Sequence, residues 1–301
     1  MGFNVTHHEQ KLNNMKIFKG LLATIGCSML CGLSANAQNS VPTSADYDAF
    51  NDTKTIVVLD DNMMSDFNSK IKSVMKAEWT PTEYEFLANK SFPTKMSDPS
   101  YSFLLTTTVT YPEDKTKAKY IYLSLLMGKE KTKKVNNLPD LISIPLAYSN
   151  RSDVDYTYKM ASFVRFILKH VELMKQNPKL ISKTPLLYYN KNIKTLKFKT
   201  LYVVKEDVEK DLRSEAAFSK AYAHKFKFVT EAEVTKAIEN KEKDVVFLHK
   251  VGPGNNKMET RCYNMIIGAD DDEIYYFDWH MVNKKSPDAL TAKDLKKMSK
   301  Q

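Results

Sequence analysis

The sequence predicts an α/β protein, with helices layered on sheets, in which two copies of one module follow each other. A run of β-branched and apolar residues at 54–58 returns at 199–203, and each run is typical of a buried strand. Each run is followed by a segment with helical spacing of apolar residues. A later strand of each copy ends at a glycine, Gly128 in the first and Gly268 in the second. Self-similarity on this scale indicates a duplicated unit.

The composition is that of a folded protein. The 301 residues are 43% hydrophobic and 11% aromatic, with only 8 Gly and 11 Pro. This chain is too apolar for a disordered protein and too poor in glycine and proline for a collagen-like or linker-like one. Three cysteines are too few for a disulfide scaffold. The length suits one large domain or two of ordinary size.

Residues 1–37 predict an N-terminal extension and a cleaved signal peptide. Lys16 and Lys19 precede an apolar stretch at 20–33, and residues 35–37 (Ala-Asn-Ala) supply the small side chains that signal peptidase requires. The mature chain would begin at Gln38. The stretch is short for a hydrocarbon core of about 30 Å, and no later segment is longer, so the mature chain is expected to lack a transmembrane helix.

Two alternatives remain open at this end of the chain. Cys27 and Cys31 lie in the apolar stretch, so a lipid anchor competes with a periplasmic or extracellular location. The residues three positions before them, Thr24 and Ser28, are not the leucine that a lipidated cysteine normally has there. Translation starts at Met1 or at Met15. Cleavage would lower the formal net charge from +9 to +7 and leave Cys262 as the only thiol.

The first module is predicted over residues 54–176, after an N-terminal segment at 38–53. Its first helix is expected where Met63, Phe67, Ile71 and Val74 form one apolar stripe. In the second module, predicted over 199–301, the matching but weaker stripe comprises Val208, Leu212, Ala216 and Ser219. Residues 177–198, which begin with Asn177-Pro178 and are rich in Lys and Asn, are expected to link the modules.

A second helix is predicted in each module from a capping box. Thr80 with Glu83 and Thr230 with Glu233 both follow the pattern Thr-x-x-Glu, in which the Thr and Glu side chains satisfy free amides of the first helical turn. Apolar residues flank both boxes, with Trp79 before the first, so each is expected to form a hydrophobic staple. The predicted alignment places Trp79 over Phe228 or Val229 and Gly128 over Gly268.

The remaining strands and the closing helix complete a β-α-β-α-β-β-(β)-α order for each module. Alternating or continuous apolar patterns predict the strands, and helical spacing predicts the final helices. The expected strands are 101–109, 120–128 and 141–146 in the first module and 244–250, 260–268 and 274–279 in the second, and the closing helices are 156–176 and 289–300.

This element order resembles, at the level of fold only, the small α/β domains of the TolB N-terminal part and of CsgG-like envelope proteins. The likeness covers the larger part of each module and includes no shared signature motif, so it implies a fold and no functional residues. The Lys-, Asn- and Tyr-rich composition and the Ala-Asn-Ala-Gln junction resemble exported proteins of Bacteroidota.

Four side chains are the weak candidates for catalysis. Asp60 and Asp61 follow the first strand, where sites of α/β proteins often lie, although helix capping explains them equally. Cys262 and His249 are the thiol–imidazole pair that the second module offers, but a nucleophilic cysteine needs an accessible, electropositive setting. Cys262 lies within a predicted strand, which favours a structural role.

Other polar motifs predict no cofactor or metal site. His170, His224, His249 and His280 lie in different elements without metal-ligand spacing. The loop at 252–257 (GPGNNK) lacks the rest of a phosphate-binding motif and is predicted as a hairpin turn. The acidic run at 270–273 lacks EF-hand spacing and is predicted as a solvated loop. No nucleic-acid-binding motif accompanies the basic residues.

The matching features of the two copies are structural, whereas the polar candidates differ between them. The sequence therefore favours a non-enzymatic binding or scaffolding protein of the cell envelope, with an envelope protein or ligand as its unidentified partner. The alternative is a hydrolase-like enzyme with its site in the cleft between the modules, built from Asp60, Asp61 or His249.

Overall fold

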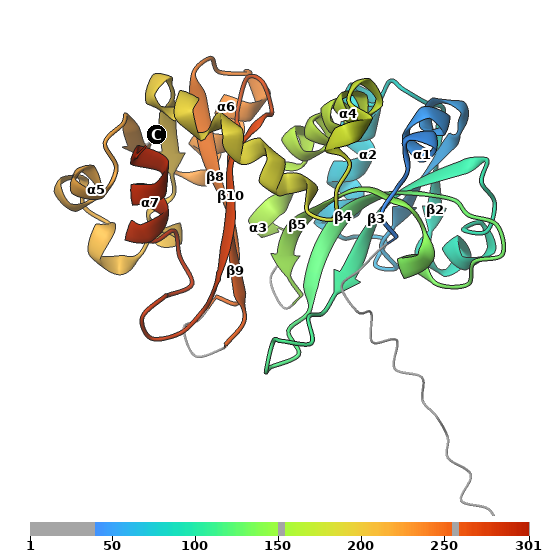
Figure 1. Ribbon diagram of the computed structural model, residues 1–301, viewed down its shortest axis with the longest axis horizontal. Helices are drawn as coiled ribbons and strands as arrows, with labels where there is room; N and C mark the ends of the chain where they lie inside the picture. The colour runs from blue at the N-terminus through green and yellow to red at the C-terminus, as the bar shows by residue number, and fades with distance from the viewer. Residues whose placement is uncertain (1–39, 150–153, 255–258, 301) are drawn as a thin grey trace, which may run out of the picture. The chain divides into compact units, whose positions relative to one another are not determined.

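The computed structural model describes residues 40–149, 154–254 and 259–300 (Figure 1). The predicted signal peptide, with Met15, Cys27, Cys31 and the expected terminus Gln38, lies outside the described residues. Two mixed five-stranded sheets form the framework, in the orders β2-β1-β3-β4-β5 and β7-β6-β8-β9-β10. No helix of the described part is long and apolar enough to cross a membrane.

The first sheet combines three parallel strands with an antiparallel meander. Strand β1 pairs in parallel with β2 and β3, and β3, β4 and β5 pair antiparallel. Its elements, in chain order, are α1 Ser44–Ala49, η1 Phe50–Asp52, β1 Lys54–Leu59, α2 Asp66–Glu78, β2 Tyr84–Ala88, η2 Asn89–Thr94, β3 Tyr101–Val109, β4 Tyr120–Met127, η3 Val135–Asn137, β5 Asp140–Tyr148, α3 Val154–Thr157 and α4 Met160–Gln176.

The second sheet repeats this pairing pattern with β6 in the place of β1. The 3-10 segments η4 Pro178–Leu180 and η5 Pro185–Phe198 lie between the two sheets in sequence. The elements that follow are β6 Thr200–Val203, η6 Lys205–Asp207, η7 Lys210–Leu212, α5 Glu215–Ala221, β7 Phe226–Phe228, α6 Glu231–Glu239, β8 Val245–Val251, β9 Arg261–Gly268, β10 Ile274–Met281 and α7 Ala292–Ser299.

The predicted duplication is confirmed in strand order, but its residue alignment was wrong by one position at the first strand. Thr55 pairs with Tyr84 of β2 and with Ser102 of β3. In the second sheet, Leu201 pairs with the first residue of β7 and with Val246 of β8. Leu201 therefore corresponds to Thr55. The similar residues at 54–58 and 199–203 are offset by one position when the two sheets are aligned by their strand pairing.

The two glycines are not equivalent either. Ser102 pairs with Met127, whereas the equivalent Val246 pairs with Gly268. Gly268 therefore corresponds to Met127. Gly128 follows one position later, where an added Cβ would lie 1.9 Å from the carbonyl oxygen of Asp98. Close approach of another chain segment, and not a shared strand end, explains why residue 128 is a glycine.

Trp79 corresponds to Tyr222, contrary to the predicted match with Phe228 or Val229. Trp79 is the C-cap of α2, and Tyr222 is the C-cap of α5. The two helices also begin alike, because the side chains of Ser65 and Ser214 each accept a hydrogen bond from the third helical amide.

The predicted stripes fit only partly. In the first module, Phe67, Ile71 and Val74 are buried on α2, but Met63 precedes the helix and is 81% exposed. In the second, both Val208 and Leu212 precede α5: Val208 forms an isolated β-bridge with Leu290, and Leu212 ends the 3-10 turn η7.

The capping box predicted at Thr80 was wrong, and with it the staple of Trp79. The segment after Thr80 leads into strand β2. The Glu83 carbonyl accepts a hydrogen bond of 2.8 Å from the amide of Thr55, and the Thr82 hydroxyl lies 2.6 Å from the Thr55 hydroxyl. A helix here would leave the edge of β1 without a partner strand, so strand pairing overrides the local capping signal.

The capping box at Thr230 is confirmed. The Thr230 hydroxyl accepts from the Glu233 amide, and the Glu233 carboxylate accepts from the Thr230 amide. The Glu233 carboxylate accepts hydrogen bonds from the Thr230 amide, from Lys227 and from the Thr230 hydroxyl, and these lower its pKa to about 2. The same reciprocal arrangement starts α1 and α7, with Asp46 and Asp294 in the place of the glutamate. The pattern Thr-x-x-Asp in the sequence would have indicated both.

These observations predict different effects for two similar substitutions. Thr230→Ala should lower the free energy of unfolding by about 0.5–2 kcal/mol, because it removes the acceptor for a helix-start amide. Thr80→Ala should change it by less than about 0.5 kcal/mol, because Thr80 is exposed and caps no helix. Urea unfolding of both variants measures this, and equal losses would contradict the assignment.

One apolar core joins the two sheets. Helices α2 and α4 cover one face of the first sheet, and the same cluster includes Phe247 and Met265 on the facing strands β8 and β9. The opposite face of the first sheet packs against Phe92 of η2 and Met96. The far face of the second sheet packs against α5 and α7.

An ion pair also crosses this interface. Arg165 of α4 donates two hydrogen bonds, of 2.7 and 2.9 Å, to the carboxylate of Asp272 in the β9–β10 turn, and a third to Glu78. The prediction of a solvated loop at 270–273 is therefore wrong for Asp272, which is only 2% exposed. Asp270 and Asp271 pair with Lys199.

Candidate functional site

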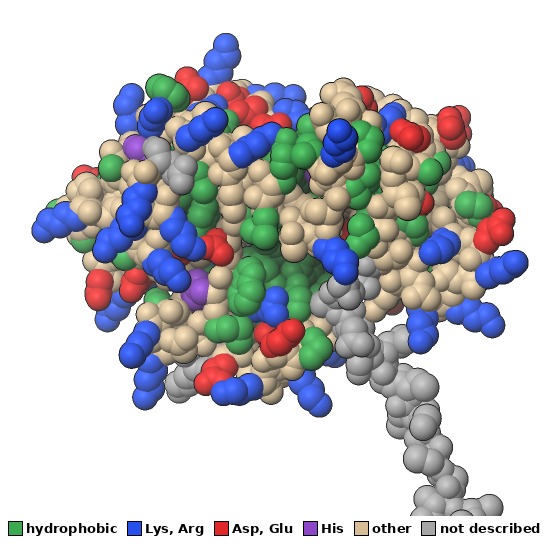
Figure 2. All heavy atoms as spheres, in the orientation of Figure 1, with side chains coloured by type: hydrophobic (Ala, Val, Ile, Leu, Met, Phe, Trp, Pro, Cys, Tyr) green, Lys and Arg blue, Asp and Glu red, His purple; other side chains and the backbone are tan. Residues whose placement is uncertain are grey.

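A crevice with a volume of about 500 Å³ lies between the two sheets. One wall comes from β3, β4 and β5, another from β9 and β10, and the segment 182–187 before and into η5 forms the third. Figure 2 shows this face hollowed near its centre, with hydrophobic side chains on the floor. The volume lies within the range of about 300–1,000 Å³ that is usual for small-molecule sites.

An arginine clamped between two aromatic rings forms one end of the crevice. The guanidinium of Arg261 lies 3.5 Å from the ring centroid of Tyr111 and 4.3 Å from that of Trp279. Glu113 and Asp114 pair with it at 3.2 and 3.4 Å. The guanidinium charge is therefore neutralised by two carboxylates of the first module, and its main effect is to hold the two rings in place.

Two equivalent tyrosines meet in this crevice. By the strand register, Tyr263 of β9 occupies the position that Tyr122 has in β4, and their ring centroids lie 6.3 Å apart. The Tyr122 hydroxyl lies 2.9 Å from that of Tyr111. The buried Tyr263 hydroxyl adjoins both but makes no hydrogen bond of normal geometry. Burial raises the pKa of Tyr122 and of Tyr263, so both phenols stay neutral.

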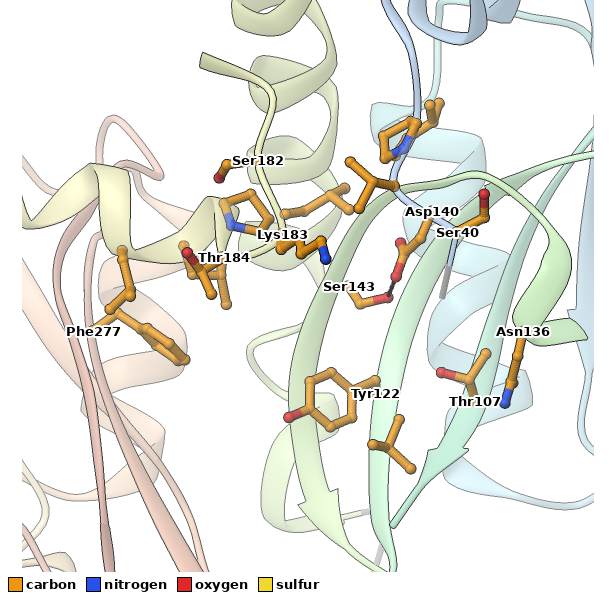
Figure 3. Close-up of a pocket in the computed structure, with 18 of the residues that line it drawn as sticks. Ser40, Thr107, Tyr122, Asn136, Asp140, Ser143, Ser182, Lys183, Thr184 and Phe277 are labelled. Carbon is orange, nitrogen blue, oxygen red and sulfur yellow. Dashed lines mark hydrogen bonds between the residues drawn. The ribbon is translucent and has the colours of Figure 1, made fainter. Parts of the chain in front are cut away.

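A row of hydroxyls crosses the wall formed by β3, β4 and β5. Thr107, Ser124 and Ser143 are linked by contacts of 2.8 and 2.7 Å, and Ser143 donates to Asp140 at 2.7 Å. Each hydroxyl has one proton to donate, and the Asp140 carboxylate can only accept. The hydrogen bond from Ser143 to Asp140 therefore fixes the direction of the other two hydrogen bonds in the row. Ser143 donates to Asp140, Ser124 to Ser143, and Thr107 to Ser124. Figure 3 shows Thr107, Tyr122 and Ser143 lining the pocket.

The difference between the two crossover connections helps to explain why this wall is open. In the second module, the connection from β7 to β8 contains the helix α6, whose buried face joins the core between the modules. In the first, the connection from β2 to β3 starts with the short segment η2, whose Phe92 covers only the part of the sheet around Phe103. Thr107 of β3 and Ser143 of β5, at either side of the buried Ser124, are left facing the crevice.

The rim of the crevice carries exposed apolar side chains. Val41, Leu187 and Trp279 are 38%, 47% and 41% exposed, and all three line the crevice. They are three of the seven large hydrophobic side chains exposed among the described residues. Clustering of exposed apolar surface around a hollow is typical of interaction sites.

The predicted carboxylates lie elsewhere. Asp60 and Asp61 follow β1, as expected, at the carboxyl end of the parallel strands. The backbone of Asp60 is held by the side chain of Asn68, and the hydroxyl of Thr106 lies 3.5 Å from its carboxylate. Asn89 donates to Asp61. Neither aspartate lines the crevice.

The predicted thiol and imidazole are both buried. His249 is 1% exposed, contacts the carbonyl of Pro145 at 2.9 Å, and packs against Phe163. Cys262 is 0% exposed, and burial raises the pKa of its thiol. His249 lies on β8 and Cys262 on β9, and neither contacts the crevice.

The glycine-containing loop after β8 holds a carboxylate of its own chain. The amide of Gly254 donates to Asp288 at 2.6 Å, and Lys250 pairs with the same carboxylate at 3.0 Å. An added Cβ at Gly252 would lie 1.8 Å from that carboxylate, so a glycine at this position allows Asp288 to approach the backbone closely. Among the residues that the structure describes, no group of His, Cys, Asp and Glu has the arrangement of a metal site.

The crevice residues were missed in the sequence because they come from five separate strands and a connecting segment. The sequence contained one indication of this site. Phe277 and Trp279 alternate on a predicted strand, so they share one face of the sheet, and Tyr263 and Arg261 do the same on the neighbouring strand.

Comparison with known protein families, curated proteins and solved structures gives no match for this chain. The resemblance to the TolB N-terminal part and to CsgG-like proteins therefore stays a prediction.

Proposed function

We propose that the chain is an exported binding protein of the cell envelope and that the crevice between its sheets is the ligand site. The observation that carries this proposal is the combination of a deep hollow with a rim of exposed apolar side chains. A hollow of this size with several converging polar groups is typical of ligand-binding sites. The signal-like sequence at 1–37 supports export.

The residues around the crevice favour binding over catalysis. The hydroxyls of Tyr122 and Tyr263 are held neutral by burial, which raises the pKa of both, and the arginine of the crevice is already paired with two carboxylates. Catalysis by a thiol or an imidazole needs an accessible group beside the substrate, and His249 and Cys262 are buried elsewhere. The hydrolase alternative would have to use Asp60 and Asp61 at a separate edge of the first sheet.

A dye-binding experiment tests whether the crevice takes ligands. The mature chain should bind 1-anilinonaphthalene-8-sulfonate at one site, with a rise in dye fluorescence. Leu187→Asp should weaken this binding about tenfold or more, because it places a charge on the apolar rim and removes a leucine contact.

Phe198→Asp is the matched control. Phe198 lies on the same segment η5, is 70% exposed, and does not line the crevice. It should leave the dye affinity unchanged, and circular dichroism should show both variants folded. Equal effects of the two substitutions, or absence of saturable binding to the folded wild-type chain, would refute the proposed function.

A further inference from the structure

The polar groups of the crevice carry information about the chemistry of its ligand. The hydroxyl row is directed toward Asp140, so the Thr107 proton is used within the row and its oxygen faces the crevice as an acceptor. Reversal would require Ser143 to give up its bond to the carboxylate. A ligand that satisfies Thr107 must therefore bring a hydrogen-bond donor.

The Tyr263 side chain presents its ring to the crevice. Tyr263 is 3% exposed and lines the crevice, but its hydroxyl is closed off from solvent and lies beside the hydroxyls of Tyr111 and Tyr122. A ligand in the crevice therefore meets the aromatic ring of Tyr263 and not its hydroxyl.

The charges around the crevice do not select for a charged ligand. Arg261 is neutralised by Glu113 and Asp114, and Lys183 faces the side of the crevice that holds Asp140 (Figure 3). A ligand of large net charge of either sign would gain little from this lining.

A flat apolar surface stands beside these polar groups. Trp279 is 41% exposed at the rim, and one face of its ring is held by Arg261. The ring is therefore fixed before any ligand binds, which reduces the entropy lost on binding. Phe277 and Tyr263 lie next to it with stacked rings, 6.1 Å between centroids.

We infer that the crevice binds an uncharged oligosaccharide. This inference rests on the proposed function and names its ligand class. A sugar ring offers an apolar face of C–H groups to an aromatic ring and hydroxyls, which both donate and accept, around its rim. Trp279 would take the apolar face, and the Thr107 oxygen would accept a hydrogen bond from a sugar hydroxyl.

The experiment is a glycan array probed with the mature chain, followed by calorimetry with the best neutral oligosaccharide. Saturable binding of at least one uncharged glycan is expected. Thr107→Val should weaken it about 2- to 12-fold, because it removes one hydrogen bond without changing the side-chain volume greatly. Trp279→Ala should weaken it by a similar or larger factor.

Thr106→Val is the matched control for Thr107→Val. Thr106 is the adjacent threonine of β3, so it points to the other side of the sheet, and its hydroxyl faces Asp60. It should leave glycan affinity unchanged. The best glycan should also displace the dye from the wild-type chain.

The outcomes separate the two proposals. If the crevice binds the dye with the expected dependence on Leu187 but the array shows no neutral glycan, the ligand class is wrong and the proposed function stands. Binding confined to acidic glycans, or to apolar peptides used as competitors of the dye, likewise overturns the ligand class. Glycan binding that Thr106→Val and Thr107→Val weaken equally places the ligand elsewhere and overturns the inference.

Discussion

Arg165→Met should lower the free energy of unfolding by about 3–5 kcal/mol, because it leaves a carboxylate buried without its partner. The side chains of Arg165 and Asp272 are 10% and 3% exposed, and their two hydrogen bonds join α4 to the β9–β10 turn. Urea unfolding of the mature chain, followed by circular dichroism, measures the loss.

The double variant Arg165→Met with Asp272→Asn separates the charge from the packing. Asp272 has a positive φ of 51°, a backbone conformation that asparagine adopts readily. Removing both charges should recover much of the stability, since the cost comes mainly from the unpaired carboxylate. A single variant as stable as the wild type would show that this ion pair does not hold the sheets together.

Acid should destabilise the protein through His170. This side chain is fully buried between two tyrosines, with Nε2 3.3 Å from the Tyr47 hydroxyl and Nδ1 2.8 Å from the Tyr189 hydroxyl. Burial lowers its pKa from 6.5 to about 4. Between these values the unfolded chain takes up a proton and the folded chain does not, so stability falls as the pH falls.

The expected loss from His170 is about 1.4 kcal/mol per pH unit, or roughly 3 kcal/mol between pH 6.5 and pH 4. Above pH 6.5 the contribution should be constant. His249 has a pKa lowered by burial and by Lys159, so it adds to the loss in the same direction.

The comparison of wild type with His170→Gln isolates this contribution. Glutamine can hydrogen-bond the tyrosines but does not titrate, so the variant should show a shallower fall of the unfolding free energy below pH 6.5. Its stability at pH 7 is expected to be lower. Identical pH slopes for the two proteins would mean that His170 titrates with the same pKa in the folded and the unfolded chain, and would contradict this prediction.

Local sequence patterns predicted most strands because those strands are buried and their own residues are apolar. The strands expected at 101–109 and 120–128 agree with β3 and β4, and the helix expected at 289–300 agrees with α7. Strand β2 was missed because its identity depends on pairing with β1 and not on its own residues, among which Tyr84 is only partly buried and Phe86 is exposed. The alignment of the two copies failed for the same reason: register is set by pairing, not by similar letters.

The candidate site could not be predicted, because it exists only where two sheets meet. Trp279 and Thr107 are far apart in sequence, and each has an ordinary local setting. A cysteine such as Cys262 is a candidate nucleophile when only the sequence is known, yet the fold buries this one against the carbonyl of Ala289. The order of the hydroxyl row also depends on strand register, which places Ser124 between Thr107 and Ser143.

A crystal structure of the mature chain with the neutral oligosaccharide selected on the array tests the central claim most directly. The account predicts electron density for the sugar in the crevice, with one ring against Trp279 and a hydroxyl within hydrogen-bonding distance of Thr107. Sugar bound instead at the edge that holds Asp60 and Asp61, with the crevice empty, would contradict it.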